Sequence, residues 1–570
     1  MANATVAEHR PRLLFGSLAG YDRRWLRGDL IAGLTVWAVL VPEALAYASI
    51  AGVSPVIGLY AAPPALIFYA MFGSSRHLVV GPMSATAALS AAAVADLTVG
   101  GPKDVLAFTG VLAIMTGLIA LAAGVLRLGF LANFISEPVL KGFIIGLALT
   151  IIIGQVPKLF GVEKTDGDFF QQLWGVIRHL GDTQGRTLAV GLISLAIVLG
   201  LRRWLPMVPG SLVAVIFGIA AVKVLNLQDK GVEIVGHIDS GLPSFGLPED
   251  RTFNDYLRAA ASAAGIMLVG FAEGLGAAKT YAARAHYEVD ANRELLGLGA
   301  ANLSAGLSSG MVVNGSLSKT AVNGGAGAKS QVSGLVVAVI TVLTLLFLTG
   351  LFEDLPEATL AAVVIAAVIE LVDIGALRGF YRMYSSRLGR IYGHAARPDF
   401  IAAVAAMLGV LIFDTLPGLV IGILVSLGLL LYRTSKPHVA RLGLVRSTDQ
   451  FSDIDRHPDN EPTPGVAVLR VESGVFFANA DAVRDAIKQA AAEPGIRGVV
   501  LDAEAIAFVD VTSVRMLHEV GADLARTGQR LVIARDLGQV ADLLDAEPDS
   551  SLTLTRSIRL GIAEINGSVA

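Results

Sequence analysis

The 570-residue chain is 54% hydrophobic and only 16% charged, with a mean hydropathy of +0.65. Soluble domains carry about 25% charged residues, so the composition predicts a membrane protein with several spans. A net charge of −4 excludes a basic nucleic-acid surface, and the lack of cysteine excludes disulfides, cysteine-ligated zinc and thiol catalysis.

Apolar stretches predict about fourteen membrane segments, of which two would be half-spans, since a full span needs about 20 apolar residues. Arg23, Arg24 and Arg27 precede the first stretch, and Arg433 and Lys436 follow the last. By the positive-inside rule, both termini are predicted to be cytoplasmic and the chain integral to the plasma (inner) membrane. The predicted segments lie near residues 29–50, 56–72, 83–95, 104–126, 130–154, 187–201, 210–225, 257–281, 293–308, 318–329, 333–352, 357–372, 399–414 and 417–432.

The charge balance changes along the chain. Residues 441–570 carry 20 acidic and 13 basic side chains, whereas the rest carries 28 acidic and 31 basic. Residues 441–464 are polar and contain prolines, which predicts a linker. Strand and helix patterns alternate over 465–570 and predict a small α/β domain. A cytoplasmic segment at 1–27 and a transmembrane domain at 28–440 complete the predicted organisation.

Two sequence patterns recur in the same order. Residues 38–46 (AVLVPEALA) resemble 267–276 (MLVGFAEGLG), each with a lone glutamate, Glu43 or Glu273. Downstream by 41 and 45 residues, the tripeptide SAT that begins at Ser84 resembles the SKT that begins at Ser318. This similarity predicts a duplicated unit, over about 28–226 and 255–434. Seven spans in each copy, an odd number, would invert the second copy in the membrane.

Residues 81–86 (GPMSAT) and 314–320 (NGSLSKT) are hydroxyl-rich breaks between apolar stretches. If each begins a short helix, unpaired N–H groups and roughly half a positive charge meet near the bilayer midplane. Serine and threonine hydroxyls add donors, and Lys319 adds a full positive charge. Together they predict an anion site. The alternative, that small residues allow close helix packing, does not account for Lys319.

Glu43 and Glu273 lie inside otherwise apolar stretches. Burial favours the neutral form of a carboxylate, so a glutamate beside an anion site could take up H⁺ or Na⁺ and couple cation entry to anion entry. Glu273 is the stronger candidate, because Pro42 distorts the helix beside Glu43. The alternatives are that Glu273 pairs with Lys279 or Arg284, and that Glu43 is a neutral packing residue.

These patterns resemble the sulfate permease (SulP) family of anion transporters, whose animal relatives include prestin and pendrin. Residues 476–480 (FFANA) and 508–513 (FVDVTS) resemble the STAS domain with which the family ends. The matching membrane motifs are 27–35 (RGDLIAGLT), 42–48 (PEALAYA), 51–60 (AGVSPVIGLY), 73–77 (GSSRH) and 81–82 (GP).

The resemblance implies fourteen segments in two inverted seven-segment repeats, which form a core and a gate domain, and a homodimer. It implies an anion held between the third and tenth segments, with sulfate, bicarbonate, chloride or a carboxylate as the usual substrates. The implied anion-binding residues are Met83, Ser84, Ala85, Thr86, Ser316, Leu317, Ser318 and Lys319, with Tyr47, Glu43 and Glu273 lining the site.

The chain departs from the family pattern at two of these positions. The family commonly has glutamine where this chain has Glu43, and a carboxylate would repel an anion unless it were protonated or paired. This favours proton coupling. Animal members often have arginine where this chain has Lys319, and lysine lacks the planar bidentate fork of arginine.

In STAS domains switched by kinases, a serine or threonine follows the aspartate at a helix start. Thr512 or Ser513 would have that role here, with a cytoplasmic regulator as partner. Alternatively, Asp510, Thr512 and Ser513 only cap the helix that begins there.

The sequence therefore predicts a secondary active transporter of a small inorganic oxyanion, sulfate first and bicarbonate second, with proton-coupled symport. The alternatives are a Na⁺-coupled bicarbonate or dicarboxylate transporter and a passive anion channel or exchanger. No enzyme activity, catalytic residue, metal or cofactor is predicted beyond H⁺ or Na⁺ as the coupling ion. Residues 324–330 (GGAGAKS) resemble a P-loop but lack the glycine before the lysine. The predicted partners are the anion, the lipid bilayer and a second copy, without nucleic acid.

Overall fold

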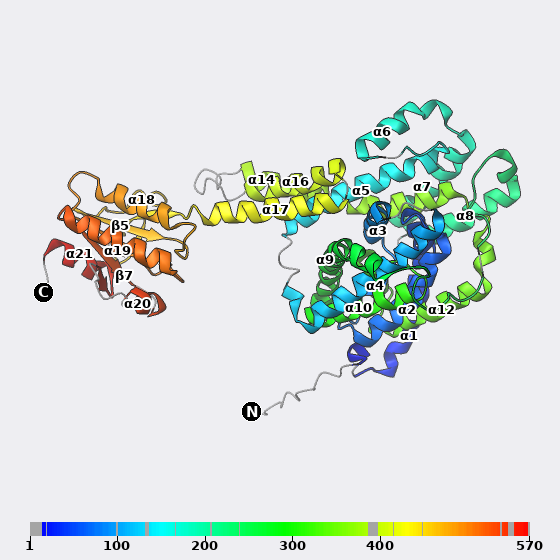
Figure 1. Ribbon diagram of the computed structural model, residues 1–570, viewed down its shortest axis with the longest axis horizontal. Coiled ribbons are helices and arrows are strands. Elements are labelled where there is room, and N and C mark those ends of the chain that lie inside the picture. The colour runs from blue at the N-terminus through cyan, green and yellow to red at the C-terminus, as the bar shows by residue number, and fades with distance from the viewer. Residues whose placement is uncertain are drawn as a thin grey trace. The chain divides into compact units, whose positions relative to one another are not determined.

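The computed structural model describes residues 14–567 apart from 19, 98–100, 131–135, 166, 206–207, 239, 386–396, 414, 447, 536–537 and 545–551. The chain forms two compact units (Figure 1). The first comprises Met1–Phe380 and Asp399–Val425, and the second comprises Tyr381–Pro398 and Ser426–Ala570.

Apolar helices build the first unit. Within the described residues, six helices are long and apolar enough to cross a membrane. They are α1 (Leu26–Ile50), α2 (Pro55–Phe72), α4 (Pro102–Val125), α5 (Glu137–Phe160), α7 (Gly185–Trp204) and α9 (Phe253–Ala285). The other helices are α3 (Ser84–Leu97), α6 (Phe169–Arg178), α8 (Gly210–Leu225), α10 (Ala291–Leu307), α11 (Leu317–Gly325), α12 (Val332–Phe347), α13 (Glu357–Val368), α14 (Ile374–Ser385), α16 (Arg397–Phe413) and α17 (Thr415–Thr434).

Each of the fourteen predicted stretches contains a helix, and the largest shift of a boundary concerns the fifth. That segment was expected at 130–154, of which 131–135 lie outside the described residues, but α5 runs from Glu137 to Phe160. Proline occupies the first turn of α5, where its missing N–H costs no hydrogen bond. Gly161, at φ 67°, ends the helix in the left-handed conformation that glycine adopts without strain.

The helices of the first unit pack in groups. α4 lies against α9 and α10, α2 contacts α10, and α1 contacts α2 and α12 (Figure 1). α13 packs against α5 and α7, and α7 packs against α8. Small residues allow the closest approaches: a Cβ on Gly142 of α5 would lie 1.9 Å from the carbonyl oxygen of Ala403 in α16.

α3 and α11 are too short to span a bilayer. They have 14 and 9 residues, or about 21 and 14 Å at 1.5 Å per residue, against a hydrocarbon core of about 30 Å. Each follows a short strand, β1 (Val79–Gly81) before α3 and β2 (Asn314–Ser316) before α11.

The second unit contains a six-stranded sheet in the order β4-β3-β5-β6-β7-β8. The strands are β3 (Val439–Leu444), β4 (Phe451–Asp453), β5 (Val466–Val471), β6 (Gly498–Asp502), β7 (Arg530–Ala534) and β8 (Thr553–Thr555), with helices α18 (Ala480–Ala491), α19 (Val511–Arg526), α20 (Gly538–Leu544) and α21 (Ile558–Asn566). β5 to β8 are parallel, and β3 and β4 are antiparallel additions.

Alternating side chains of the central strands form two cores. On β5, Ala467, Leu469 and Val471 pack with residues of α18 and α19. Val466 and Val468 belong to the opposite core, which includes α21. Strands covered on both faces are apolar on both faces, which explains the nearly continuous apolar runs in the sequence.

The segment 441–464, expected to be a linker, differs from that expectation. It contains most of β3 and all of β4, which pair with each other, while β3 also pairs with β5. Polar and proline-bearing sequence suggested a connection, but β3 pairs with β5 through residues 439–441 and with β4 through residues 442–444, which makes the segment part of the sheet. Burial of Ala440 and Leu442 against the central strands stabilises this arrangement.

Candidate functional site

The two hydroxyl-rich breaks lie side by side. β1 and β2 pair antiparallel, with Val79 opposite Ser316, Val80 opposite Gly315 and Gly81 opposite Asn314. Each strand leads directly into a half-helix, so this pairing brings the beginnings of α3 and α11 together. The Val79 amide also donates to the Thr320 hydroxyl at 3.1 Å, which ties β1 to the first turn of α11.

Lys319 is buried at this junction, with 1% of its surface exposed. Its Nζ lies 2.8 Å from Oε2 of Glu43 on α1 and donates to the carbonyl oxygen of Pro82 at 3.1 Å. Nζ also lies 5.1 Å from the ring centroid of Tyr47, a cation–π distance. The lysine therefore points into the protein rather than into lipid, with its charge compensated by Glu43.

Tyr47 and Glu43 occupy neighbouring turns of α1. Glu43 is 6% exposed, and Tyr47 is buried beside both Glu43 and Ser84. An i, i+4 spacing puts both side chains on the same helix face, toward the start of α3. The structure thus brings together Tyr47, Glu43, Ser84 and Lys319.

Neighbouring side chains satisfy part of the free backbone N–H groups at the start of α11. The Ser316 hydroxyl accepts a hydrogen bond from the Lys319 amide at 3.2 Å and lies 3.1 Å from the Ser318 hydroxyl. This is N-cap chemistry, which satisfies one of the helix's free donors. Ser316 is buried, whereas Leu317 and Ser318 are exposed, so an approaching solute would meet Ser318 first.

The start of α3 is enclosed. Met83, Ser84, Ala85 and Thr86 are all buried. The Met83 carbonyl accepts from the Ala87 amide at 2.9 Å and from the Thr86 hydroxyl at 3.3 Å. The Thr86 hydroxyl is therefore bonded within the helix, whereas the Ser84 hydroxyl of the same turn lies beside Tyr47.

Glu273 lies on α9, which packs against β2. Its Oε2 is buried without a hydrogen-bond partner among the described residues. Within the described part of the chain, Glu273 forms no ion pair with Lys279 or Arg284. Such a pair was the alternative interpretation of this glutamate in the sequence. Asn314 packs closely against Gly270 and Gly274 of α9. A Cβ on either glycine would lie 3.2 Å from Oδ1 of Asn314.

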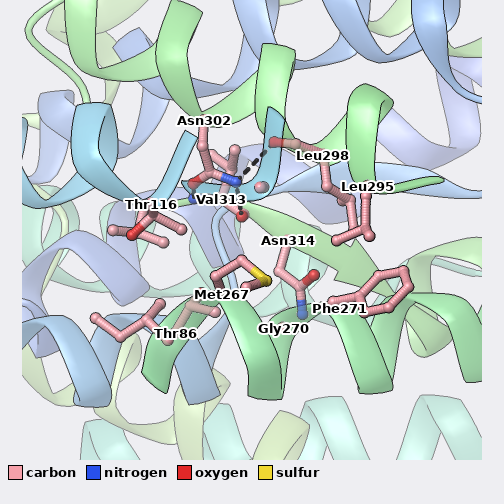
Figure 2. Close-up of a pocket in the computed structure, with 13 residues that line it drawn as sticks. Thr86, Thr116, Met267, Gly270, Phe271, Leu295, Leu298, Asn302, Val313 and Asn314 are labelled. Atoms are coloured by element: carbon pink, nitrogen blue, oxygen red, sulfur yellow. Dashed lines mark hydrogen bonds between the residues drawn. The ribbon is translucent and has the colours of Figure 1, made fainter. Parts of the chain in front are cut away.

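A small cavity of about 10 Å³ lies between α3, α4, α9, α10 and β2 (Figure 2). Thr116 and Asn314 line it, and the Thr116 hydroxyl and Asn314 Nδ2 are buried without partners within the described chain. One water occupies about this volume, so the cavity is too small for an oxyanion.

The sequence did not predict the buried polar side chains that hold the segments next to β1 and β2 in place. Asn302 donates to the carbonyls of Leu298 and Val313, both at 2.9 Å, and accepts from the Val313 amide at 3.0 Å (Figure 2). Glu294, fully buried, accepts from the Tyr69 hydroxyl at 2.7 Å and from the Ser74 amide at 2.8 Å. The sequence feature that could have identified Glu294 as a buried, hydrogen-bonded residue is its charge within an otherwise apolar helix.

Asp29 has a similar supporting role near the start of α1. It is fully buried and accepts from the Lys329 and Ser330 amides at 2.7 and 3.2 Å, and from the Ser330 hydroxyl at 2.7 Å. These bonds tie α1 to the connection between α11 and α12. They position both the helix that carries Glu43 and the half-helix that carries Lys319.

In the second unit, Asp510 is the N-cap of α19. It accepts from the Ser513 amide at 2.9 Å, the Ser513 hydroxyl at 2.8 Å and the Phe477 amide at 2.8 Å. Burial alone would raise the pKa of Asp510, but these hydrogen bonds hold it below its usual value. Ser513 is fully buried, whereas Thr512 is exposed.

Two half-helices that begin beside one another within a bundle of apolar helices define a polytopic membrane protein of the discontinuous-helix class. The chain belongs to the sulfate permease family, whose model matches residues 26–388, and a STAS domain matches residues 457–548. These matches confirm the resemblance read from the sequence motifs.

Relatives extend over nearly the whole chain. A protein of Mycobacterium tuberculosis named probable sulfate transporter is 36% identical over 543 residues, covering 94% of this chain and 95% of its own. Sulfate transporter 1.1 of Arabidopsis thaliana is 29% identical over 547 residues, covering 91% of this chain and 82% of its own.

Two solved structures share the fold. Murine solute carrier 26 family member A9, an anion transporter in the inward-facing state, matches with a TM-score of 0.85 at 20% identity, covering 100% of this chain and 96% of its own. The transmembrane domain of a cyanobacterial bicarbonate transporter, BicA, matches with a TM-score of 0.60 at 24% identity, covering 70% and 98%. At these identities the likeness concerns the fold alone.

Proposed function

We propose that the protein is a secondary active transporter of a small inorganic oxyanion, sulfate first and bicarbonate second, driven by proton symport. The observation that carries the proposal is the position of Lys319, buried where two half-helices begin. Intramembrane cations are costly and mark functional sites. The names of the relatives, one of them 36% identical over 543 residues that cover 94% of the chain, support sulfate as the first substrate to test.

Glu43 and an oxyanion would compete for the same ammonium group. With Oε2 of Glu43 2.8 Å from Nζ, a second anion near Lys319 meets a site whose charge is already compensated. Protonation of Glu43 removes the competitor and leaves Lys319 free to bind the oxyanion, together with the hydroxyls of Ser84 and Ser318. The proton bound at Glu43 would then enter together with the anion, which couples the two movements.

Glu273 is proposed as a second coupling carboxylate. Its buried oxygen lacks a partner within the described residues, and it lies on the helix that packs against β2. A carboxylate in this setting gains from binding H⁺ or Na⁺, because the cation supplies the missing interaction. Movement of α9 relative to β2 would then depend on the charge of Glu273.

The proposed architecture is fourteen segments in two inverted repeats, with a transport domain that ends before β3 and a cytoplasmic STAS domain that begins at Val439, because β3 and β4 belong to its sheet. Packing of α1 and α2 with α10 and α12, and of α5 and α7 with α13, supports a division into core and gate. Transport would proceed by an elevator-like or rocking movement of the core. Cytoplasmic termini and a homodimer belong to the same proposal.

Thr512 is the residue we propose for regulatory phosphorylation of the STAS domain. It is exposed in the first turn of α19, whereas Ser513 is buried and bonded to Asp510. A phosphate at a helix N-terminus is favoured by the helix dipole, although Asp510 would oppose it.

The test is uptake of labelled sulfate and labelled bicarbonate by purified protein in liposomes, under imposed pH and Na⁺ gradients separately. The proposal expects saturable sulfate uptake that is driven by an inward proton gradient. Uptake driven by Na⁺ alone would favour a sodium symporter. Large anion currents without gradient dependence would show a channel, and the absence of sulfate uptake in the presence of bicarbonate uptake would change the substrate.

A further inference from the structure

Helix α6 carries an exposed apolar stripe. Phe170, Trp174 and Ile177 are 49%, 67% and 49% exposed. Their i, i+4, i+7 spacing places them on one face of the helix. Three large apolar side chains in a row are costly to expose to water, so this face requires an apolar environment.

The remainder of α6 is fixed to the protein. Asp168 and Gln171 form a capping box at the helix start. Gly175 is buried, and a Cβ there would lie 2.1 Å from the Thr165 hydroxyl oxygen. Because glycine makes this close contact on another side of the helix, the direction of the apolar stripe is set by the fold.

The neighbouring helices show what the stripe meets. α6 packs against α5, is connected to it by residues 161–168, and is followed by α7 after residues 179–184. Both neighbours are candidate membrane spans, so these short connections keep α6 within reach of the membrane surface. Along its most apolar stretch, α7 is only 28% buried, whereas the corresponding stretches of the other five spans are 50% to 67% buried. This edge of the unit therefore faces lipid.

We propose that α6 is an interfacial helix that lies along the membrane surface, with Phe170, Trp174 and Ile177 inserted among the lipid headgroups and upper acyl chains. Helices with one apolar and one polar face adopt this position, and tryptophan is enriched at that depth. A second copy of the chain is less suitable as the occupant. A helix about 15 Å long with three apolar side chains offers far less than the roughly 800 Å² per partner of a stable interface.

The consequence is a fixed depth for the helices beside α6. A helix anchored at the surface resists movement of α5 and α7 along the membrane normal. Lys319 and Glu273 lie on other helices, α11 and α9. This consequence depends on the proposed transport mechanism, but the lipid contact itself does not.

The natural chain lacks cysteine, which permits a direct test. Single-cysteine variants Phe170→Cys, Trp174→Cys and Ile177→Cys are labelled with a nitroxide in phosphatidylcholine liposomes, with Lys164→Cys, at an exposed position in the connection before α6, as the control. The three stripe positions should collide more with oxygen than with a water-soluble nickel complex, and position 164 should show the reverse. Higher nickel accessibility at all four positions would overturn the proposal.

A second copy would give a different pattern. Labels at position 174 would then be shielded from both reagents and would broaden one another, and Trp174→Cys would form a disulfide-linked dimer. That result also overturns the proposal. If the cysteine variants fail to fold, quenching by brominated phosphatidylcholine is compared between the natural chain and Trp174→Phe. The variant should lose part of the lipid-quenched tryptophan emission, and equal quenching would reject the lipid contact.

Discussion

Lys319 Nζ and Glu43 Oε2 lie 2.8 Å apart, and both side chains are more than 90% buried. This pair connects α1 to α11 at the junction of the two half-helices. A buried ion pair of this kind contributes little net stability, because desolvation offsets the attraction, but loss of one partner is severe. The pair is therefore better suited to switching than to holding the fold together.

We predict that Glu43→Gln strengthens anion binding, because the neutral amide no longer competes with the anion for Lys319. Loss of a competing interaction of about 1.4 kcal/mol corresponds to a tenfold gain in affinity. Isothermal titration with sulfate in detergent measures the affinity, with the exposed Glu163→Gln as the control. Equal affinity in variant and natural protein would remove Glu43 from this role.

Lys319→Ala should abolish anion binding and destabilise the protein. Glu43 would be left buried without its partner, at a cost of about 3–5 kcal/mol. The double variant Glu43→Gln/Lys319→Met should recover most of the stability but not the binding. Thermal unfolding in detergent measures the first effect and sulfate titration the second, with exposed Lys279→Ala on α9 as the control. Sulfate affinity unchanged in Lys319→Ala would contradict the assignment.

Glu273→Gln is expected to abolish gradient-driven uptake while leaving equilibrium sulfate binding largely intact. The amide keeps the size of the side chain but cannot change its charge when a cation arrives. Uptake by liposomes under an inward proton gradient, compared with sulfate titration of the same preparation, separates the two properties. The exposed Glu163→Gln serves as a control. Driven uptake at the natural rate would show that Glu273 does not couple transport.

Gly315→Ala should disturb the β1–β2 pairing that brings the half-helices together. Its Cβ would lie 2.8 Å from Leu78 Cδ2 and 3.0 Å from the Gly274 Cα, so β2 and α9 must separate. Overpacking of this kind costs about 1–3 kcal/mol. Gly325→Ala, at the end of α11 with open space around it, is the matched control. We expect a lower melting temperature and reduced sulfate uptake for Gly315→Ala only; equal behaviour would argue against tight packing here.

Asp510→Asn should destabilise the start of α19 by about 0.3–1 kcal/mol at neutral pH, because asparagine caps a helix as well as aspartate does but lacks the negative charge that the helix N-terminus favours. Hydrogen bonds lower the pKa of Asp510 in the folded protein, so its stabilising effect is present above the unfolded value of about 3.9 and is lost as pH falls through the lower folded value. The difference between variant and natural chain should therefore disappear in acid. Hydrogen exchange of residues 511–526 measures it, with exposed Asp481→Asn as the control. A difference that persists below the folded pKa would contradict this origin.

The sequence alone identified the features that depend on near neighbours. Hydropathy placed a helix in each of the fourteen stretches, because a span is a local run of apolar residues. The paired breaks at Ser84 and Ser318 were visible because glycine and hydroxyl residues interrupt such runs. The α/β pattern of β5, β6 and β7 was visible as well, because buried parallel strands are continuously apolar.

The tertiary structure decided which distant groups meet. Nothing in the local sequence shows that Lys319 pairs with Glu43, that Glu294 accepts from Tyr69, or that residues 439–444 join the sheet beside β5. These contacts depend on how helices and strands remote in the chain pack, where a buried charge or backbone group must find a partner to offset its lost hydration. Sequence could place the lysine at depth; only the packed protein shows which carboxylate holds it.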